Sequence, residues 1–417
     1  MADSKPDSTR KNIVVCLDGT GNQIRASGNT NVIRLFRALE NNAGRQILYY
    51  DPGVGTFSAA GAWTRTGRWF SRLLGRAFGV GMKTNLAEAY TFLMNHWEPD
   101  DKIYIFGFSR GAYTARALAG LLHTVGLPRP SSENLVQYAI ATYARRRNWT
   151  DADRKEATEF ARTVCRSVNG GFSIPVHYMG IWDTVSAPGI FRRDLLFENA
   201  GALENVVAGR HAISIDEKRR PYREFTVQNP RMEEAWFAGV HSDVGGGFED
   251  AELSNISLMW VLKGACANDV ELREFAELRE LPTVVESDAM GAVHRMGRIW
   301  ALATYRHRKP APRAKVHDSV RVRISANPAY RPILRDPVWV DEDWCNHEVS
   351  NPPDESLAPR RHDTAGVGDI VLAEPVVDDL GRTQEAEDGS SQTRWNVNEH
   401  HRVDIEREGS TRYRGIL

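Results

Sequence analysis

The stretch "IYIFGFSRGAYTARALAGLL", residues 103–122, places one serine between two glycines, after an apolar run and before a run with helical spacing. Its residues Gly107 to Gly111 fit the pattern G-x-S-x-G. In a nucleophile elbow the serine sits in a strained turn between strand and helix, where side chains at the glycine positions would collide with neighbouring segments. The motif in this context predicts that Ser109 is a nucleophile. The alternative is a glycine-lined turn with a capping serine.

Apolar runs and helix-spaced segments alternate along the chain around this motif. Residues 12–17, "NIVVCL", are typical of a buried strand that enters a glycine loop. This alternation predicts an α/β fold, with a mainly parallel sheet and helices on both faces. The other expected strands lie in "RQILYYDPGVGT" and over 102–108, 174–183 and 234–243, and the helices over 30–40, 83–97 and 110–125.

The 417 residues suffice for one large domain or two ordinary ones. We expect a polar N-terminal tail over 1–11 and a main domain over 12–335, with a helical insertion at 131–168. Residues 336–417 are polar and rich in Pro, Gly and Ser, which predicts a partly disordered or small accessory region.

Composition narrows the partners and the compartment. A net charge of −1 gives no electrostatic case for nucleic acid. The four cysteines form no C-x-x-C pair, which predicts neither a zinc site nor a disulfide framework. The start of the chain lacks the apolar segment of a signal peptide, and no apolar run of about 18 residues follows. We therefore expect the protein to be cytoplasmic as synthesised. Export by a route that cleaves no signal peptide is the alternative.

A serine hydroxyl needs a base, and His241 is the best of the twelve histidines. It follows the apolar run "WFAGV" and precedes the loop "SDVGGG". The others lie before the serine, before an apolar run, inside expected elements, or in basic or polar sequence. The acid is expected between serine and histidine, and Asp183, at the end of "VHYMGIWD", leads. It would fix the tautomer of His241. Asp216 and Asp243 are the rivals, Asp243 being better suited to organising its glycine loop.

The glycine loop "DGTGN", residues 18–22, suits an oxyanion hole, which needs two backbone N–H donors. Arg110, directly after the serine, would supply one donor. Gly19 or Thr20 would supply the other, with Asp18 bracing the loop. A simple tight turn is the alternative.

Six ordered motifs resemble a widespread microbial serine-hydrolase family, long catalogued as a domain of unknown function. It includes the Tle-type lipase effectors of type VI secretion. The resemblance covers about residues 12–335 and implies an α/β-hydrolase-like fold, the triad Ser109, Asp183 and His241, and a glycerophospholipid or other acyl ester as substrate. It also implies a secretion-apparatus or immunity protein as partner, although the chain has no recognisable secretion-adaptor module. The motifs are "VVCLDGTGN", "YYDPGVGT", "FGFSRGAYTARALAGLL", "GIWDTV", "AISIDE" and "FAGVHSDVGGGF".

Residues 63–83, "WTRTGRWFSRLLGRAFGVGMK", predict a basic amphipathic helix. Trp69 and Phe70 belong to its apolar face, whereas the basic face contains Arg65, Arg68, Arg72 and Arg76. Such a helix can contact lipid at a membrane interface, and a core helix with a solvated arginine face is the alternative.

Several other functions are weaker. "VVCLDGT" has Cys16 where a haloacid-dehalogenase-like phosphatase needs its nucleophilic aspartate, and "GVGMKT" lacks the G-K-[ST] of a phosphate loop. No ligand spacing supports a metal-dependent hydrolase. The proposed chemistry needs no cofactor or metal, with calcium at an acidic loop left open. The remaining alternatives are a carboxylesterase acting on small soluble esters and a non-catalytic binding protein with a hydrolase fold.

Overall fold

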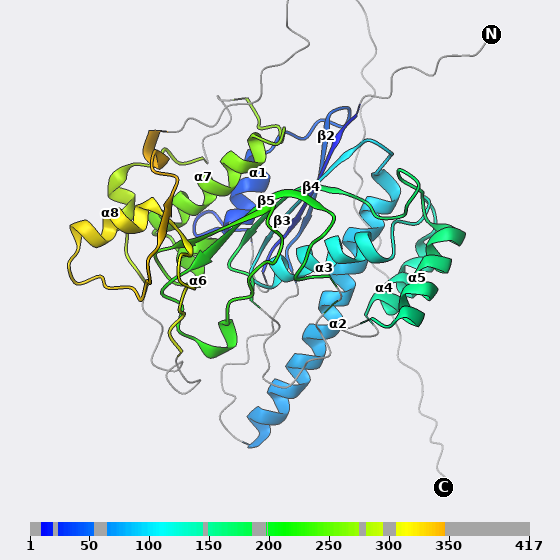
Figure 1. Ribbon diagram of the computed structural model, residues 1–417, viewed down its shortest axis with the longest axis horizontal. Coiled ribbons are helices and arrows are strands. Elements are labelled where there is room, and N and C mark those ends of the chain that lie inside the picture. Colours follow the sequence, from blue (N-terminus) through cyan, green and yellow to red (C-terminus); the bar gives the residue numbers. More distant parts are fainter. Residues whose placement is uncertain are drawn as a thin grey trace, which may run out of the picture. The chain divides into compact units, whose positions relative to one another are not determined.

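The computed structural model describes residues 10–19, 24–53, 65–144, 149–185, 197, 199–274, 281–294 and 306–346, without the side chains of 65–80, 221 and 346. Figure 1 shows a central sheet with helices on both sides. The expected tail at 1–11 therefore lies almost entirely outside the described residues, as does most of 336–417.

The sheet has eight strands in the order β2-β1-β3-β4-β5-β6-β7-β8, and all neighbouring strands pair in parallel. This agrees with the expected α/β class. The strands are β1 (Asn12–Leu17), β2 (Gln46–Asp51), β3 (Lys102–Phe108), β4 (Val176–Trp182), β5 (Val206–Ser214), β6 (Met232–Phe237), β7 (Lys315–His317) and β8 (Val338–Val340).

Helices cover both faces of this sheet (Figure 1). They are α1 (Asn31–Ala38), α2 (Arg65–His96), α3 (Arg110–Thr124), α4 (Glu133–Tyr143), α5 (Asp151–Val164), α6 (His241–Gly245), α7 (Glu252–Cys266) and α8 (Asp318–Ala326). Short 3₁₀ turns are η2 (Arg220–Tyr222), η4 (Glu286–Met290) and η6 (Trp344–Asn346).

Each face of the sheet packs into a different apolar cluster, because successive side chains of a strand point in opposite directions. Ile13 and Val15 of β1 join the cluster that contains α2, α3 and α4. Val14 and Cys16 of the same strand join the cluster with α1 and α7. A burial pattern without alternation, as in β1, is thus the mark of a strand covered on both sides.

Strand order reverses direction at β1, because β2 lies on one side of it and β3 on the other. In open parallel sheets, ligands bind beyond the carboxyl ends of the strands at such a switch point. The loops after β1 and β3 meet there. A site at this edge is therefore built from segments far apart in the sequence.

The structure differs from the sequence-based expectations in four places. One continuous helix, α2, replaces the separate segments expected over 63–83 and 83–97. The short helix α6 begins at His241 and includes part of the loop expected over "SDVGGG". The strands β5, β7 and β8 and helices α7 and α8 were not anticipated, because they offer no glycine motif or clear period. Since β8 joins the same sheet, the folded part extends past the expected boundary at 335.

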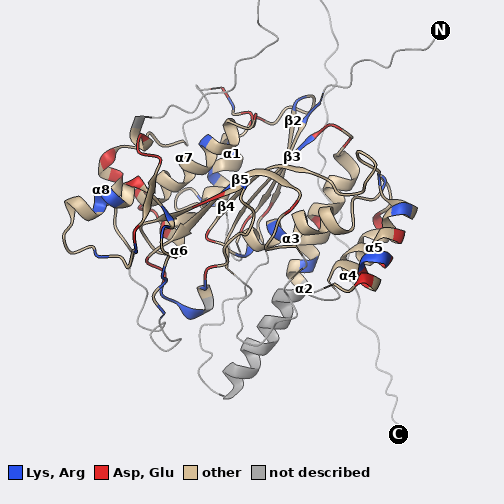
Figure 2. Cartoon of the chain, in the orientation of Figure 1, with Lys and Arg blue, Asp and Glu red and all other residues tan. Residues whose placement is uncertain are grey.

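The expected insertion at 131–168 contains α4 and α5. Figure 2 shows acidic and basic residues interspersed on α5, as the near-zero net charge suggests.

In the described part of the chain, no helix has the length and apolar character to cross a membrane.

Candidate active site

Ser109 lies directly between β3 and α3, in a backbone conformation that is rare for serine. Its φ of 59° and ψ of −117° lie outside the helical and extended regions, while its N–H donates to Trp182 O at 3.0 Å. Such strain persists only where the surrounding structure enforces it, and it is concentrated at functional sites. The turn places Ser109 at the carboxyl end of β3, at the edge of the sheet where the parallel strands end.

The two glycines of the motif allow the chain to make this turn. A Cβ added at Gly107 would lie 2.7 Å from Gly111 O. One added at Gly111 would lie 2.1 Å from Leu17 O, at the end of β1. These glycines therefore let the first turn of α3 approach the neighbouring strand, which is the steric reason expected from the motif.

His241 approaches the serine from the end of β6. Its Nε2 lies 2.8 Å from Ser109 Oγ. Two aromatic rings flank the imidazole, Phe108 at 4.6 Å and Tyr222 edge-on at 4.9 Å between ring centroids. The ring is buried, so packing as well as hydrogen bonding fixes its orientation.

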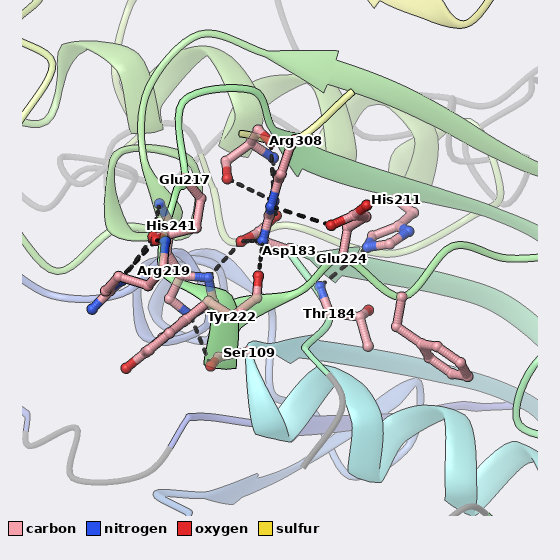
Figure 3. A network of polar contacts seen from close by, with 12 residues as sticks. Ser109, Asp183, Thr184, His211, Glu217, Arg219, Tyr222, Glu224, His241 and Arg308 are labelled. Carbon is pink, nitrogen blue, oxygen red and sulfur yellow. Dashed lines mark hydrogen bonds and ion pairs between the residues drawn. The ribbon is translucent and has the colours of Figure 1, made fainter. Parts of the chain in front are cut away.

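Asp183 lies on the opposite side of the imidazole, at the end of β4. Its Oδ2 lies 2.5 Å from His241 Nδ1, and its Oδ1 accepts from the Ser214 N–H at 2.9 Å. Its φ of 37° is another positive value at this edge. The structure thus brings together Ser109, His241 and Asp183 in one hydrogen-bonded chain (Figure 3).

Burial and neighbouring charges set the protonation states of His241 and Asp183. Burial lowers the pKa of His241 below its ordinary value, although the hydrogen bond and charge of Asp183 oppose that shift. Burial alone would raise the pKa of Asp183, but the Arg308 charge and the His241 hydrogen bond outweigh it and hold the pKa below the ordinary value. At neutral pH the imidazole is therefore neutral and the carboxyl ionised. This is the state in which Nδ1–H donates to Asp183 and Nε2 accepts from Ser109.

The rival acids occupy other positions. Asp216 accepts from the Gly239 N–H at 2.7 Å and from the Tyr330 hydroxyl at 2.9 Å. Asp243 accepts from the Val240 N–H at 2.8 Å and lies 2.6 Å from His294 Nδ1. Both therefore brace the segment that carries His241, as expected for Asp243.

The loop after β1 has a more complex arrangement than expected. Asp18 accepts from the Thr30 hydroxyl at 2.6 Å, from the Tyr50 hydroxyl at 3.1 Å and from the Gly19 N–H at 2.6 Å. The bracing role expected for Asp18 fits these contacts. The Gly19 N–H, however, would have to leave this carboxylate to donate to an oxyanion. Its role as donor stays a prediction, and Thr20 lies outside the described residues.

Arg110 is the first residue of α3, directly after the serine. The positive end of a helix dipole favours negative charge near this amide. Burial lowers the pKa of the Arg110 guanidinium to about 10, so the side chain is a cation at neutral pH. Both features suit an anion formed beside Ser109.

Sequence reasoning missed four polar or aromatic neighbours. Arg308 is buried against Asp183, and Glu217 accepts from the His241 N–H at 3.3 Å. Arg219 pairs with Glu217 at 2.8 Å and lies over the Tyr222 ring at 3.6 Å. Glu217 to Tyr222 lie within and directly after the quoted motif "AISIDE", a signal that could have found them. Arg308 lies in ordinary basic sequence and offers no such signal.

The basic amphipathic helix expected over 63–83 can be compared with the structure only through its backbone. The side chains of Trp69, Phe70, Arg72 and Arg76 lie outside the described residues, although their backbone belongs to α2. Over the described positions, no three His, Cys, Asp or Glu side chains are grouped so as to hold a metal ion.

A parallel sheet covered on both faces, with this chain of polar side chains at its carboxyl edge, defines an α/β-hydrolase-like protein. Residues 11–264 match the family model described as "T6SS, Phospholipase effector Tle1-like, catalytic domain". The chain belongs to this family, and with it to a group of lipase and phospholipase hydrolases.

Similar proteins include "Uncharacterized protein YEL023C" of Saccharomyces cerevisiae, which is 34% identical over 233 residues. That match covers 53% of this chain and 33% of the yeast protein, so the chain corresponds to a third of its length. A solved structure of an uncharacterized Pseudomonas aeruginosa protein has a TM-score of 0.37 and 18% identity, covering 70% of this chain and 50% of that one. The structure of the Tle1 effector bound to the VgrG spike has a TM-score of 0.30 and 19% identity, covering 58% and 52%.

Proposed function

We propose that this protein is a serine hydrolase that cleaves carboxylic esters through a Ser-His-Asp triad and an acyl-enzyme. The observation that carries the proposal is the continuous hydrogen-bonded chain from Ser109 through His241 to Asp183. Its order along the sequence, Ser then Asp then His, is that of α/β-hydrolases. The strained turn at Ser109 supports the same assignment.

In the proposed reaction, His241 Nε2 takes the proton of the Ser109 hydroxyl while Oγ attacks the ester carbonyl carbon. Asp183 stabilises the imidazolium that forms. The backbone amide of Arg110, with Gly19 or Thr20, would hold the oxyanion. The imidazolium then protonates the departing alcohol, which leaves an acyl ester on Ser109. Water, deprotonated by His241, attacks this ester and releases the acid.

The substrate in this proposal is a glycerophospholipid or similar lipid ester, in line with the family. Exposed cations support an anionic substrate surface, because Lys218, Arg220 and Arg223 lie in the segment that also carries Tyr222. A carboxylesterase acting on small soluble esters is the alternative within the same chemistry. Because the family description names type VI secretion effectors, the proposal includes a component of a secretion apparatus as partner, and an immunity protein as a second kind of partner.

A fluorophosphonate probe tests the chemistry, since it reacts with activated serines. Wild-type protein should be labelled, whereas Ser109→Ala protein should not. Turnover of phospholipids, neutral lipids and short soluble esters by the same preparations then separates lipase from carboxylesterase. Equal turnover by both preparations would contradict the proposed nucleophile, and an unlabelled, inactive wild type would favour a non-catalytic binding protein.

The proposed reaction needs no metal, because His241 and the backbone amides supply the base and the anion stabilisation. Turnover should therefore be unchanged after treatment with a chelator. A loss that added calcium restores would instead favour a calcium site at an acidic loop.

A further inference from the structure

Arg308 joins three segments around the acid of the site. Its Nη1 donates to Asp183 Oδ1 at 2.5 Å and its Nη2 to Asp183 Oδ2 at 3.1 Å. The same guanidinium donates to the Ser214 carbonyl at 2.9 Å and hydroxyl at 2.8 Å, and to the Tyr222 carbonyl at 2.5 Å. It thus contacts the end of β4, the end of β5 and η2 (Figure 3).

This arrangement restricts the acid more tightly than a point charge could. A planar guanidinium binds a carboxylate through two parallel hydrogen bonds, which fix the plane of the carboxylate as well as its position. Asp183 is fully buried and Arg308 is 5% exposed, so water screens this pair little. With both oxygens held, Oδ2 stays directed at His241 Nδ1.

Arg308 also connects the acid to a wall of the site. The carbonyl that it binds belongs to Tyr222, whose ring lies edge-on against His241. The adjacent Arg306 N–H donates to the Lys218 carbonyl at 2.7 Å, so the two segments run together. One side chain therefore positions both the carboxylate beneath the imidazole and the ring beside it.

We propose that Arg308 is a positioning residue of the triad, which holds Asp183 ionised and aligned toward His241. This inference rests on the proposed function. Arg308 lies beyond residue 264, where the family match ends, so the site is completed by a segment that the matched region does not include. No contact of Arg308 with Ser109 is needed, because it acts through Asp183.

The consequence is a pH range of activity set by charge balance. Without Arg308, the buried negative charge of Asp183 would favour the imidazolium of His241. Burial would in addition favour a protonated Asp183. The active state has a neutral His241 and an ionised Asp183. Both changes mean that, as the pH falls, the variant loses this state at a higher pH than the wild type does. The other titratable and charged groups that face Asp183, His241 and Arg308 are Glu217, Arg219, Tyr222 and Glu224.

Arg308→Met and Arg308→Lys test the proposal, with Arg323→Met as the matched control. Arg323 is another buried arginine, at 6% exposed, and it binds the carbonyls of Ala289 and Gly291. For each folded protein we would measure the melting temperature, the rate of fluorophosphonate labelling and kcat/KM for a soluble ester from pH 4 to pH 9.

Arg308→Met should label and turn over ester at least roughly tenfold more slowly at neutral pH, and the acid limb of its profile should move up by about one pH unit. Arg308→Lys retains the positive charge but loses the two parallel hydrogen bonds of the guanidinium. Its kcat should therefore fall, while the acid limb of its pH profile stays near that of the wild type. Arg323→Met should lower the melting temperature without moving the limb.

A folded Arg308→Met protein with the rates and pH profile of Arg323→Met would overturn the positioning role. If Arg308→Met does not fold, Arg308→Lys decides, and wild-type kcat in that variant would overturn it. Failure of the underlying function has a different signature. Wild type would then not be labelled, or Ser109→Ala would be labelled equally.

Discussion

The Nε2 atom of His241 lies 2.8 Å from the Oγ of Ser109, although 132 positions separate the two residues in the chain. Parallel strands place them together, because β3 and β6 both end at the same edge of the sheet. The burial of both side chains means that this contact is enforced by packing from two elements. Its proposed catalytic role leads to the following expectations.

Ser109 and His241 should act as a unit. Ser109→Ala and His241→Ala should each lower kcat on the order of 10³-fold or more. The double variant should be no worse than either single variant, because removing one partner already abolishes proton transfer. Steady-state kinetics on a soluble ester measure this, and multiplicative losses in the double variant would show that the residues act separately.

Activity should persist at pH values at which an exposed histidine is already protonated. Burial lowers the pKa of His241, so the neutral base survives below the ordinary value of about 6.5. The value of kcat/KM should rise with pH through a midpoint below 6.5 and then level off. A profile of kcat/KM against pH gives this midpoint, and a midpoint above 7 would contradict the state assigned to the site.

The free energy of unfolding should fall as the pH is lowered into the acid range. The pKa of Asp183 is lower in the folded protein than in the unfolded chain, so its ionisation stabilises the fold above about pH 4. That contribution is lost as pH falls through the folded pKa. In denaturant melts, Asp183→Asn should therefore reduce the acid sensitivity of the free energy of unfolding, and wild-type acid sensitivity in this variant would exclude Asp183 as a major source.

Gly111→Ala should destabilise the protein. The added methyl group would meet Leu17 O at 2.1 Å, and the backbone there cannot yield without moving α3 from β1. We expect a loss of about 1–3 kcal/mol in the free energy of unfolding, with reduced activity because the elbow shifts. Gly201→Ala is the control, since no atom lies within 4 Å of its added Cβ. Equal melting temperatures for the two variants would show that the close approach is unimportant.

The basic residues expected on residues 63–83 should matter for lipid binding. Reversing the charges of Arg65, Arg68, Arg72 and Arg76 should weaken binding to anionic vesicles, because these cations would attract the surface. The control reverses four exposed cations elsewhere, at Arg154, Lys155, Arg162 and Arg313. Vesicle co-sedimentation measures the difference, and unchanged binding after the first set of reversals would mean that the helix does not contact lipid.

Much of this architecture could be predicted from local patterns. Glycine motifs and apolar runs determine β1, β3, α3 and the elbow at Ser109, because sterics within a few residues decide those turns. The choice of Ser109, Asp183 and His241 followed from the serine motif, the order of the three residues along the chain and the apolar run before each of them. Strands β7 and β8, of three residues each, were out of reach, because their stability comes from neighbours and not from their own pattern.

Tertiary structure alone decided how the site is held. The carboxylate of Asp183 is secured by Arg308, 125 positions away, and nothing in the basic sequence around residue 308 distinguishes that arginine from its neighbours. The Gly19 amide is engaged by Asp18, which a loop motif cannot reveal. Residue types and spacing therefore determined which groups have the chemistry. Packing decided which charges face them, because burial and distance set the strength of an electrostatic interaction.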